Sequence, residues 1–104
     1  LKSSARYFDV VINEIYETLL SSYVENDFFA SCEKLKKYYP NLSKGFYDFL
    51  QLYCDAHNRD ELKLRNKVLF KDESINNFQQ AILYYISGMT DHFAIKIYEE
   101  IIGF

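Results

Sequence analysis

The chain has 104 residues and a formal charge of −3, from 12 Lys and Arg against 15 Asp and Glu. This length predicts one domain, and a hydrophobic content of 49% is too high for a disordered chain. The acidic balance argues against a general electrostatic nucleic-acid binder, which needs a strongly basic face. Only 3 Gly and 1 Pro disfavour an all-β fold with many hairpins. No apolar run approaches the roughly 18 residues that span a membrane.

Apolar residues recur at helical spacing near the start of the chain: Phe8, Val11, Ile12, Ile15 and Leu19. We expect Ser3 or Ser4 to cap this helix. Asn26 or Asp27 is predicted to cap a second helix, and Pro40 is predicted to end it. The inner face of this second helix is predicted to carry Phe28, Cys32, Leu35 and Tyr39.

Ser43 is the expected cap of a third helix that fades at His57, with Phe46, Phe49, Leu50 and Tyr53 facing inward. Residues 58–72 fit no single period and predict a short helix and a loop. Asp72 or Ser74 begins a fourth helix, whose inner face carries Ile75, Phe78, Ile82, Tyr85 and Ile86. Gly88 is predicted to follow its end, and Thr90 to cap a last helix with Phe93, Ile97 and Ile101 inward. The fold class is therefore a compact all-α bundle of five or six helices.

Residues for metal or nucleophilic catalysis are sparse. The two histidines, His57 and His92, lie in different predicted helices, and no His stands in an HExxH frame. The chain contains no GxSxG elbow and no glycine-rich phosphate loop. Cys32 and Cys54 form no CxxC pair, and we expect them to be reduced, buried thiols of a cytoplasmic protein. We therefore predict no catalytic residue, metal ligand or cofactor site on this chain.

Two groups of basic residues could make a contact with nucleic acid or phosphate. Lys34, Lys36 and Lys37 precede Tyr38 and Tyr39, a mixture that also occurs where proteins bind single-stranded nucleic acid. A looser group follows in the third quarter of the chain: Lys63, Arg65, Lys67 and Lys71. With the net charge negative, we favour a solvated helix face over a basic patch that binds phosphate.

One segment carries a more specific signal. Residues 82–94, read ILYYISGMTDHFA, are followed by Tyr98, Glu99 and Glu100. The segment resembles a C-terminal signature, D-Y-I-[AS]-G-M-T-D-R-[FY]-A, of the bacterial deoxyguanosinetriphosphate triphosphohydrolase-like proteins of the HD superfamily. Nine positions match: Tyr85, Ile86, Ser87, Gly88, Met89, Thr90, Asp91, Phe93 and Ala94. Tyr84 stands where that family has Asp, and His92 where it has Arg.

The resemblance implies a C-terminal helical domain, spanning 1–104, of a longer cytoplasmic enzyme that releases inorganic triphosphate from dNTPs. The family's divalent metal is held by a His, a His-Asp pair and a distal Asp, none of which has a counterpart here. This domain would support the N-terminal HD catalytic domain and the contacts of a homo-oligomer. Tyr85, Thr90, Asp91 and His92 are then candidates for contact with a nucleotide or a neighbouring subunit. The first Leu in place of Met also leads us to expect a fragment of a longer chain.

Two other hypotheses remain open. The chain could be an independent helical module that gathers partners, or copies of itself, through its aromatic faces. It could also make a phosphate contact through its lysines. We favour a structural role for segment 82–94 itself, as a corner between two helices with Met89 and Phe93 holding the corner against the core.

Overall fold

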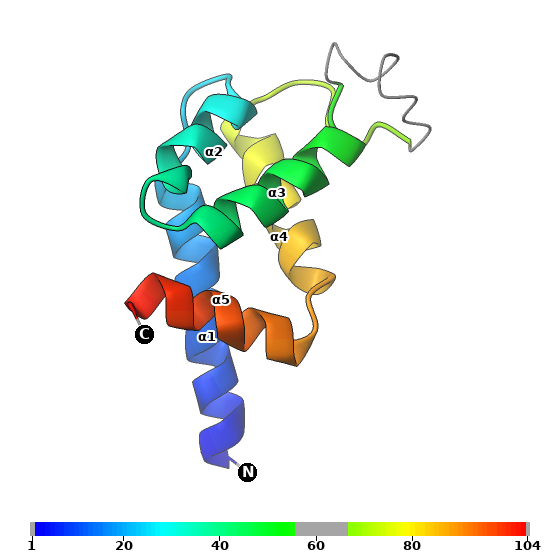
Figure 1. The fold of residues 1–104 in the computed structure, drawn as a ribbon. Helices are drawn as coiled ribbons and strands as arrows, with labels where there is room; N and C mark the ends of the chain where they lie inside the picture. Colours follow the sequence, from blue (N-terminus) through cyan, green and yellow to red (C-terminus); the bar gives the residue numbers. More distant parts are fainter. Residues whose placement is uncertain (1, 56–66, 104) are drawn as a thin grey trace.

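The computed structural model describes residues 2–55 and 67–103, with side chains from residue 6 onward, and this part of the chain folds as five helices. They are α1 (Lys2–Ser21), α2 (Phe28–Lys36), α3 (Pro40–Tyr53), α4 (Ile75–Ser87) and α5 (Asp91–Ile102). The long α1 packs against α4 and α5, and α2 pairs with α3, which also contacts α4 and α5 (Figure 1). The predicted all-α bundle is confirmed. No helix within the described ranges has the length and apolar character to cross a membrane.

The first helix begins earlier than predicted. Because α1 starts at Lys2, Ser3 and Ser4 lie inside the helix and neither residue caps it. The predicted inner face is confirmed, since Val11, Ile15 and Leu19 have no exposed surface.

Asp27 caps α2, as one of the two predicted candidates, and its carboxylate accepts from the backbone N–H of Ala30 at 2.9 Å. Asn26 takes the left-handed conformation, with φ 58°, that allows the tight turn before the cap.

The junction between α2 and α3 differs from its prediction. The second helix ends at Lys36, and Pro40 opens α3 instead of ending α2. Proline suits the first position of a helix because its missing N–H would have no partner there. Ser43 is a buried residue of α3 and not its cap, and its hydroxyl donates to the carbonyl of Cys32 at 2.6 Å. This bond ties α2 to α3.

Carboxylates from distant parts of the chain satisfy the N-termini of α2 and α3. The N–H groups of Asn41 and Leu42 donate to the two oxygens of Glu100 at 3.1 and 3.0 Å. The N–H of Phe28 donates to Glu73, whose backbone carbonyl accepts from the Tyr23 hydroxyl at 2.8 Å. A carboxylate is favoured at a helix N-terminus by the free N–H groups and by the helix dipole. Glu100 is therefore the cap that α3 lacks locally, since Tyr39 makes no side-chain capping bond.

Local caps begin the last two helices as predicted. Ser74 accepts from Asn77 N–H at 3.2 Å, and Thr90 accepts from Phe93 N–H at 3.1 Å. Two predicted inner positions are wrong: Ile75 is 48% exposed and Phe93 is 40% exposed. Ala81 and Ala94 are fully buried at the places where these helices approach their neighbours.

Aromatic rings join the helices in the centre of the molecule. The ring of Phe78 on α4 lies 5.3 Å from that of Phe28 on α2 and 5.6 Å from that of Phe46 on α3. Phe46 in turn lies 5.3 Å from Tyr85, between centroids. All three Phe side chains are fully buried. The core therefore contains a run of rings in which α2, α3 and α4 are joined by tilted or edge contacts.

Residues 67–70 return to the end of α3. The N–H groups of Leu69 and Phe70 donate to the carbonyl of Tyr53 at 2.8 and 3.2 Å, and Phe70 is buried. Most of the predicted short helix within 58–72, together with His57, Lys63 and Arg65, lies outside the described residues.

Glu100 offers a test of how α3 is held. We expect Glu100→Ala to lower the free energy of unfolding by about 2 kcal/mol, because two backbone N–H groups lose a charged acceptor. Glu99→Ala removes the neighbouring exposed carboxylate and should change stability by less than about 0.5 kcal/mol. Urea unfolding followed by circular dichroism measures both. Equal losses in the two variants would contradict the capping role of Glu100.

Candidate functional site

The segment that resembles the signature forms a tight corner between α4 and α5. The N–H of Gly88 reaches the carbonyls of Tyr84 and Tyr85 at 3.3 and 3.2 Å, and the N–H of Met89 donates to Ile86 at 3.0 Å. Thr90 then caps α5. The corner predicted from the sequence is therefore confirmed.

The backbone conformation of residue 88 does not require glycine. Its φ of −88° is open to any residue, and it does not take the left-handed conformation typical of a glycine that follows a helix. A Cβ at this position would meet only the carbonyl oxygens of Tyr85 and Tyr84, at 3.7 and 3.9 Å. Gly88 does, however, line a groove, where the lack of a side chain leaves the wall open.

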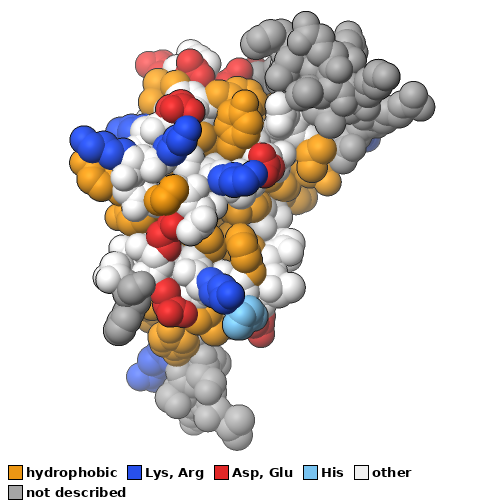
Figure 2. All heavy atoms as spheres, viewed as in Figure 1, with side chains coloured by type: hydrophobic (Ala, Val, Ile, Leu, Met, Phe, Trp, Pro, Cys, Tyr) orange, Lys and Arg blue, Asp and Glu red, His pale blue; other side chains and the backbone are white. Residues whose placement is uncertain are grey.

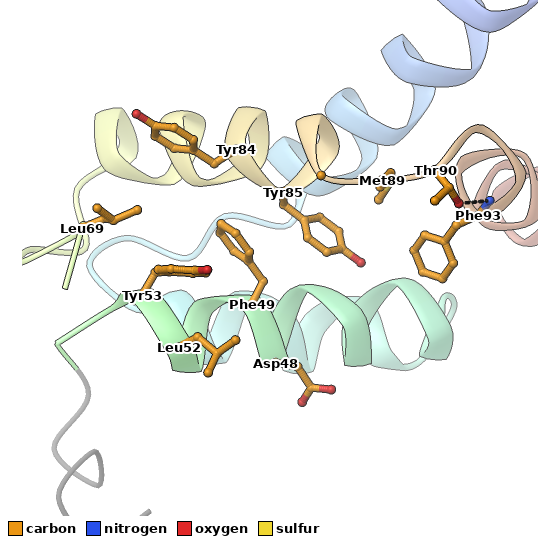
Figure 3. A pocket seen from close by; sticks show the side chains of 11 residues that line it. Asp48, Phe49, Leu52, Tyr53, Leu69, Tyr84, Tyr85, Met89, Thr90 and Phe93 are labelled. Carbon is orange, nitrogen blue, oxygen red and sulfur yellow. Dashed lines mark hydrogen bonds between the residues drawn. The ribbon is translucent and has the colours of Figure 1, made fainter. Parts of the chain in front are cut away.

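This groove, of about 750 Å³, lies between α3 and the corner, and we call it the α3–α4 groove. The corner supplies five of its lining residues: Tyr85, Gly88, Met89, Thr90 and Phe93. The facing side of α3 supplies four more: Asp48, Phe49, Leu52 and Tyr53. Leu69 and Tyr84 complete the lining. In Figure 3, Tyr85 and Phe49 extend toward each other from the two helices, whereas the ring of Tyr84 turns away from α3.

Among the described residues the lining is mainly aromatic and aliphatic, and its one charged residue is Asp48. That carboxylate bonds Lys44 at 3.1 Å one helical turn away, and both side chains are largely exposed. No Arg or Lys of residues 2–55 and 67–103 lines the groove. These lining residues therefore suit an apolar or aromatic group and include no cation for a phosphate.

Tyr85 has the least ordinary environment in the groove. Its hydroxyl is buried and has no hydrogen-bond partner among the described residues. Burial raises the pKa of this hydroxyl to about 12, and the nearby Asp48 and Cys32 add to the rise. The hydroxyl is therefore neutral at physiological pH and remains a free donor.

The Tyr85 hydroxyl fits where it does because Gly45 has no side chain. A Cβ built on Gly45 would overlap the Tyr85 oxygen, whereas the nearest ring carbon would lie 3.4 Å away, an ordinary contact. Gly45 lies in the middle of α3, where glycine lowers helix stability by about 1 kcal/mol relative to alanine. The Tyr85 hydroxyl, which reaches from α4 to the backbone of α3 at this point, explains that glycine.

The structure separates the four candidate contact residues. Tyr85 and Thr90 both line the α3–α4 groove, and the Thr90 hydroxyl is engaged in capping α5. Asp91 and His92 are exposed in the first turn of α5 and do not line the groove. Contact of these four residues with a nucleotide or a neighbouring subunit stays a prediction. Tyr85 and Thr90 would make such a contact in the groove, and Asp91 and His92 on the outer surface.

The predicted basic patch lies at the end of α2. Lys34 and Lys36 stand in the last turn and Lys37 at the C-cap, where positive charge is favoured by the helix dipole. All three are exposed, and the Lys37 ammonium lies 5.5 Å from the centre of the Tyr38 ring. Lys67 and Lys71 of the second basic group are exposed as well. These positions fit a solvated helix end.

Thiol and metal chemistry find no support in the part of the chain that the structure describes. No group of three His, Cys, Asp or Glu residues is placed there to hold a metal ion. Cys32 and Cys54 are buried cysteines in the thiol form, as predicted. Burial, then Cys54 and Glu33, raise the pKa of Cys32 to about 12, so it stays a protonated thiol.

Comparison with known proteins yields no relative. No family model, no curated protein and no solved structure matches this chain.

Two residues that matter for this region were missed by sequence reasoning. Gly45 had a signal, because an isolated glycine within a helical pattern lowers helix stability and therefore calls for an explanation. Glu100 stands just after the signature and caps the helix that forms the opposite wall of the groove. Its role needs a contact across 58 residues, which no local pattern predicts.

A double-mutant cycle tests the contact between Gly45 and Tyr85. Gly45→Ala alone should destabilise the fold by about 2 kcal/mol, because the new methyl group overlaps the hydroxyl. Tyr85→Phe alone should be neutral or stabilising by up to about 1 kcal/mol, since it removes a buried, unpaired hydroxyl. In the Tyr85→Phe background, Gly45→Ala should become neutral or stabilising through its helix propensity.

Chemical unfolding of the four proteins gives the coupling free energy directly. Additive effects of the two substitutions would contradict the contact.

Proposed function

We propose that this chain is the C-terminal helical accessory domain of an enzyme similar to the bacterial dGTP triphosphohydrolases of the HD superfamily. It carries no catalytic site of its own. Its work is to support an N-terminal HD catalytic domain and the subunit contacts of a cytoplasmic homo-oligomer. In the parent enzyme, a divalent metal held outside this chain would take part in cleaving the dNTP.

One observation carries the proposal. The segment that resembles the family signature supplies five lining residues of the α3–α4 groove: Tyr85, Gly88, Met89, Thr90 and Phe93. Phe93, which was predicted to hold the corner against the core, is instead 40% exposed and lines the groove. The signature residues are therefore arranged to shape a surface as well as to turn the chain.

The alternative is an independent helical module that binds partners or copies of itself. Its supporting observation is the same groove, whose apolar lining suits a protein side chain as well as it suits a neighbouring domain. A nucleotide contact through the α2 lysines has less support, because those side chains lie at a helix end that favours positive charge in any case.

The natural full-length polypeptide provides the test. With a divalent metal it should release inorganic triphosphate from dGTP, and a chelator should abolish the release. The 104-residue chain alone should release none. A full-length protein without any dNTP hydrolysis would contradict the proposal.

Two matched cap variants separate the role of the corner from plain stability. Thr90→Ala and Ser74→Ala each remove an N-cap hydroxyl, and each should lower the stability of the isolated chain by about 1 kcal/mol. In the full-length enzyme, Thr90→Ala should lower triphosphate release about tenfold because it loosens the groove wall, whereas Ser74→Ala should keep nearly full activity. Equal activities of the two variants would show that the corner has no role in activity beyond its contribution to stability.

A further inference from the structure

The α3–α4 groove combines aromatic walls with a negative charge at its edge. Five of its eleven lining residues are aromatic: Phe49, Tyr53, Tyr84, Tyr85 and Phe93. Asp48 is the one charged residue of the lining in the described part of the chain. The volume of about 750 Å³ lies within the range of small-molecule sites. The groove therefore has the size and the lining to hold a small molecule with an apolar body.

Three of the rings form a continuous wall. The centroid of Phe49 lies 4.9 Å from that of Tyr53 and 5.5 Å from that of Tyr85. Because the Tyr85 hydroxyl is buried against Gly45, Tyr85 offers its ring to the groove. The face of an aromatic ring carries partial negative charge and attracts a cation that lies within about 6 Å of the ring centre. A wall of such rings therefore favours a cation over a neutral molecule of the same shape.

Asp48 adds a full negative charge beside this wall. In Figure 3, Asp48 and Leu52 follow one another along the edge of α3, while Phe49 and Tyr53 stand on the side that faces α4. Among the described residues, Asp48 bonds Lys44 through Oδ2 alone, and these side chains are 57% and 78% exposed. An exposed pair of this kind is weak, and Lys44 does not line the groove. The carboxylate is therefore available to a positive group in the groove.

The wider charge distribution favours a cation as well. Asp48 contributes to the raised pKa of the Tyr85 hydroxyl, so the field of its carboxylate reaches the ring wall. The whole chain has a formal charge of −3, which disfavours anions. On the face that Figure 2 draws, acidic and basic side chains are interspersed with hydrophobic ones. The preference for a cation is therefore set locally, by the rings and by Asp48.

We propose that the α3–α4 groove is a binding site for a small organic cation, a methylated ammonium on an apolar or aromatic body. The body lies against the rings of Phe49, Tyr53 and Tyr85, and the ammonium lies near Asp48. A quaternary ammonium donates no hydrogen bond and therefore needs few acceptors. That suits a lining with one carboxylate, in which the Thr90 hydroxyl already caps α5.

A neighbouring depression limits where the cation lies. This depression, of about 370 Å³, shares Asp48 and Phe93 with the groove, and its lining includes Lys44 and Lys96. The two ammonium groups repel a cation at that end. We therefore expect the ligand to lie toward Tyr53, on the side of Asp48 that is away from the lysines.

This inference goes beyond the proposed function and does not depend on it. Loss of dNTP hydrolysis in the full-length protein would leave it intact, and absence of cation binding would leave the enzyme proposal intact.

The test is an NMR titration of the isotope-labelled 104-residue chain with phenyltrimethylammonium. tert-Butylbenzene is its neutral isostere, and benzoate is an anion with the same ring. We expect phenyltrimethylammonium to give saturable shifts of the amides of α3 and of the corner after α4. The neutral isostere should bind about fivefold more weakly, because it lacks the attraction to the ring faces. Benzoate should give no saturable shift.

Two pairs of variants locate the site. Asp48→Asn should weaken binding of the cation about threefold, whereas Glu99→Gln makes the same charge change on an exposed residue outside the groove and should have no effect. Gly88→Leu should abolish binding, because its φ of −88° admits leucine and the new side chain fills the groove. Ser87→Leu is its control, since the exposed Ser87 does not line the groove.

The amide spectrum of each variant shows whether the fold is kept. Were Gly88→Leu unfolded, the isostere pair and Asp48→Asn would decide. Equal affinity for phenyltrimethylammonium and tert-butylbenzene overturns the inference, as does the absence of saturable shifts at the groove. Equal weakening by Asp48→Asn and Glu99→Gln also overturns it, because the cation would then respond only to the net charge.

Discussion

The packing of α3 on α4 is limited by one contact, in which the Tyr85 hydroxyl lies against the bare backbone of Gly45. At that point the Tyr85 side chain reaches from α4 so close to α3 that a single methyl group on residue 45 would overlap the tyrosine oxygen. Farther along α3 the space is filled by rings, with Phe49 5.5 Å from Tyr85 and Tyr53 4.9 Å from Phe49. Phe49, Tyr53 and Tyr85 also line the α3–α4 groove. The rings that pack α3 against α4 therefore also give the groove its apolar lining.

Long-range hydrogen bonds keep this arrangement at both ends of α3. Glu100 from the end of α5 satisfies its first N–H groups, and residues 69 and 70 bond the carbonyl of Tyr53 at its last turn. The corner at Gly88 to Thr90 then sets where α5 begins, and hence where Glu100 lies. The segment that resembles the signature, the Glu100 cap of α3 and the groove therefore depend on one another structurally. A functional role for the segment needs no reactive group in it, only this placement of Tyr85, Met89 and Phe93.

Local chemistry explains what could be predicted from the sequence. Periodicity found the buried side of α1, and short polar residues before apolar runs found the caps Asp27, Ser74 and Thr90. These features depend on neighbours within one or two turns. Pro40 and Ser43 were assigned wrongly because each residue type has two common positions in helices. Pro40 could end α2 or begin α3, and Glu100, which accepts from the N–H of Asn41, stabilises the start of α3. Ser43 could cap α3 or lie inside it, and its hydroxyl donates to the Cys32 carbonyl. The α3–α4 groove could not be predicted from the sequence for the same reason, because its two walls, α3 and the corner after α4, lie about forty residues apart in the chain.

The accessory-domain proposal stands on a segment of thirteen residues and on the groove that it shapes, without a matching relative. Its most direct test is the mass of the natural polypeptide, by immunoblot of source cells with an antibody against this chain. An accessory domain requires a polypeptide several times heavier than 12.4 kDa, with the His and His-Asp motifs upstream. A native polypeptide close to 12.4 kDa would contradict it and leave the chain as an interaction module in its own right.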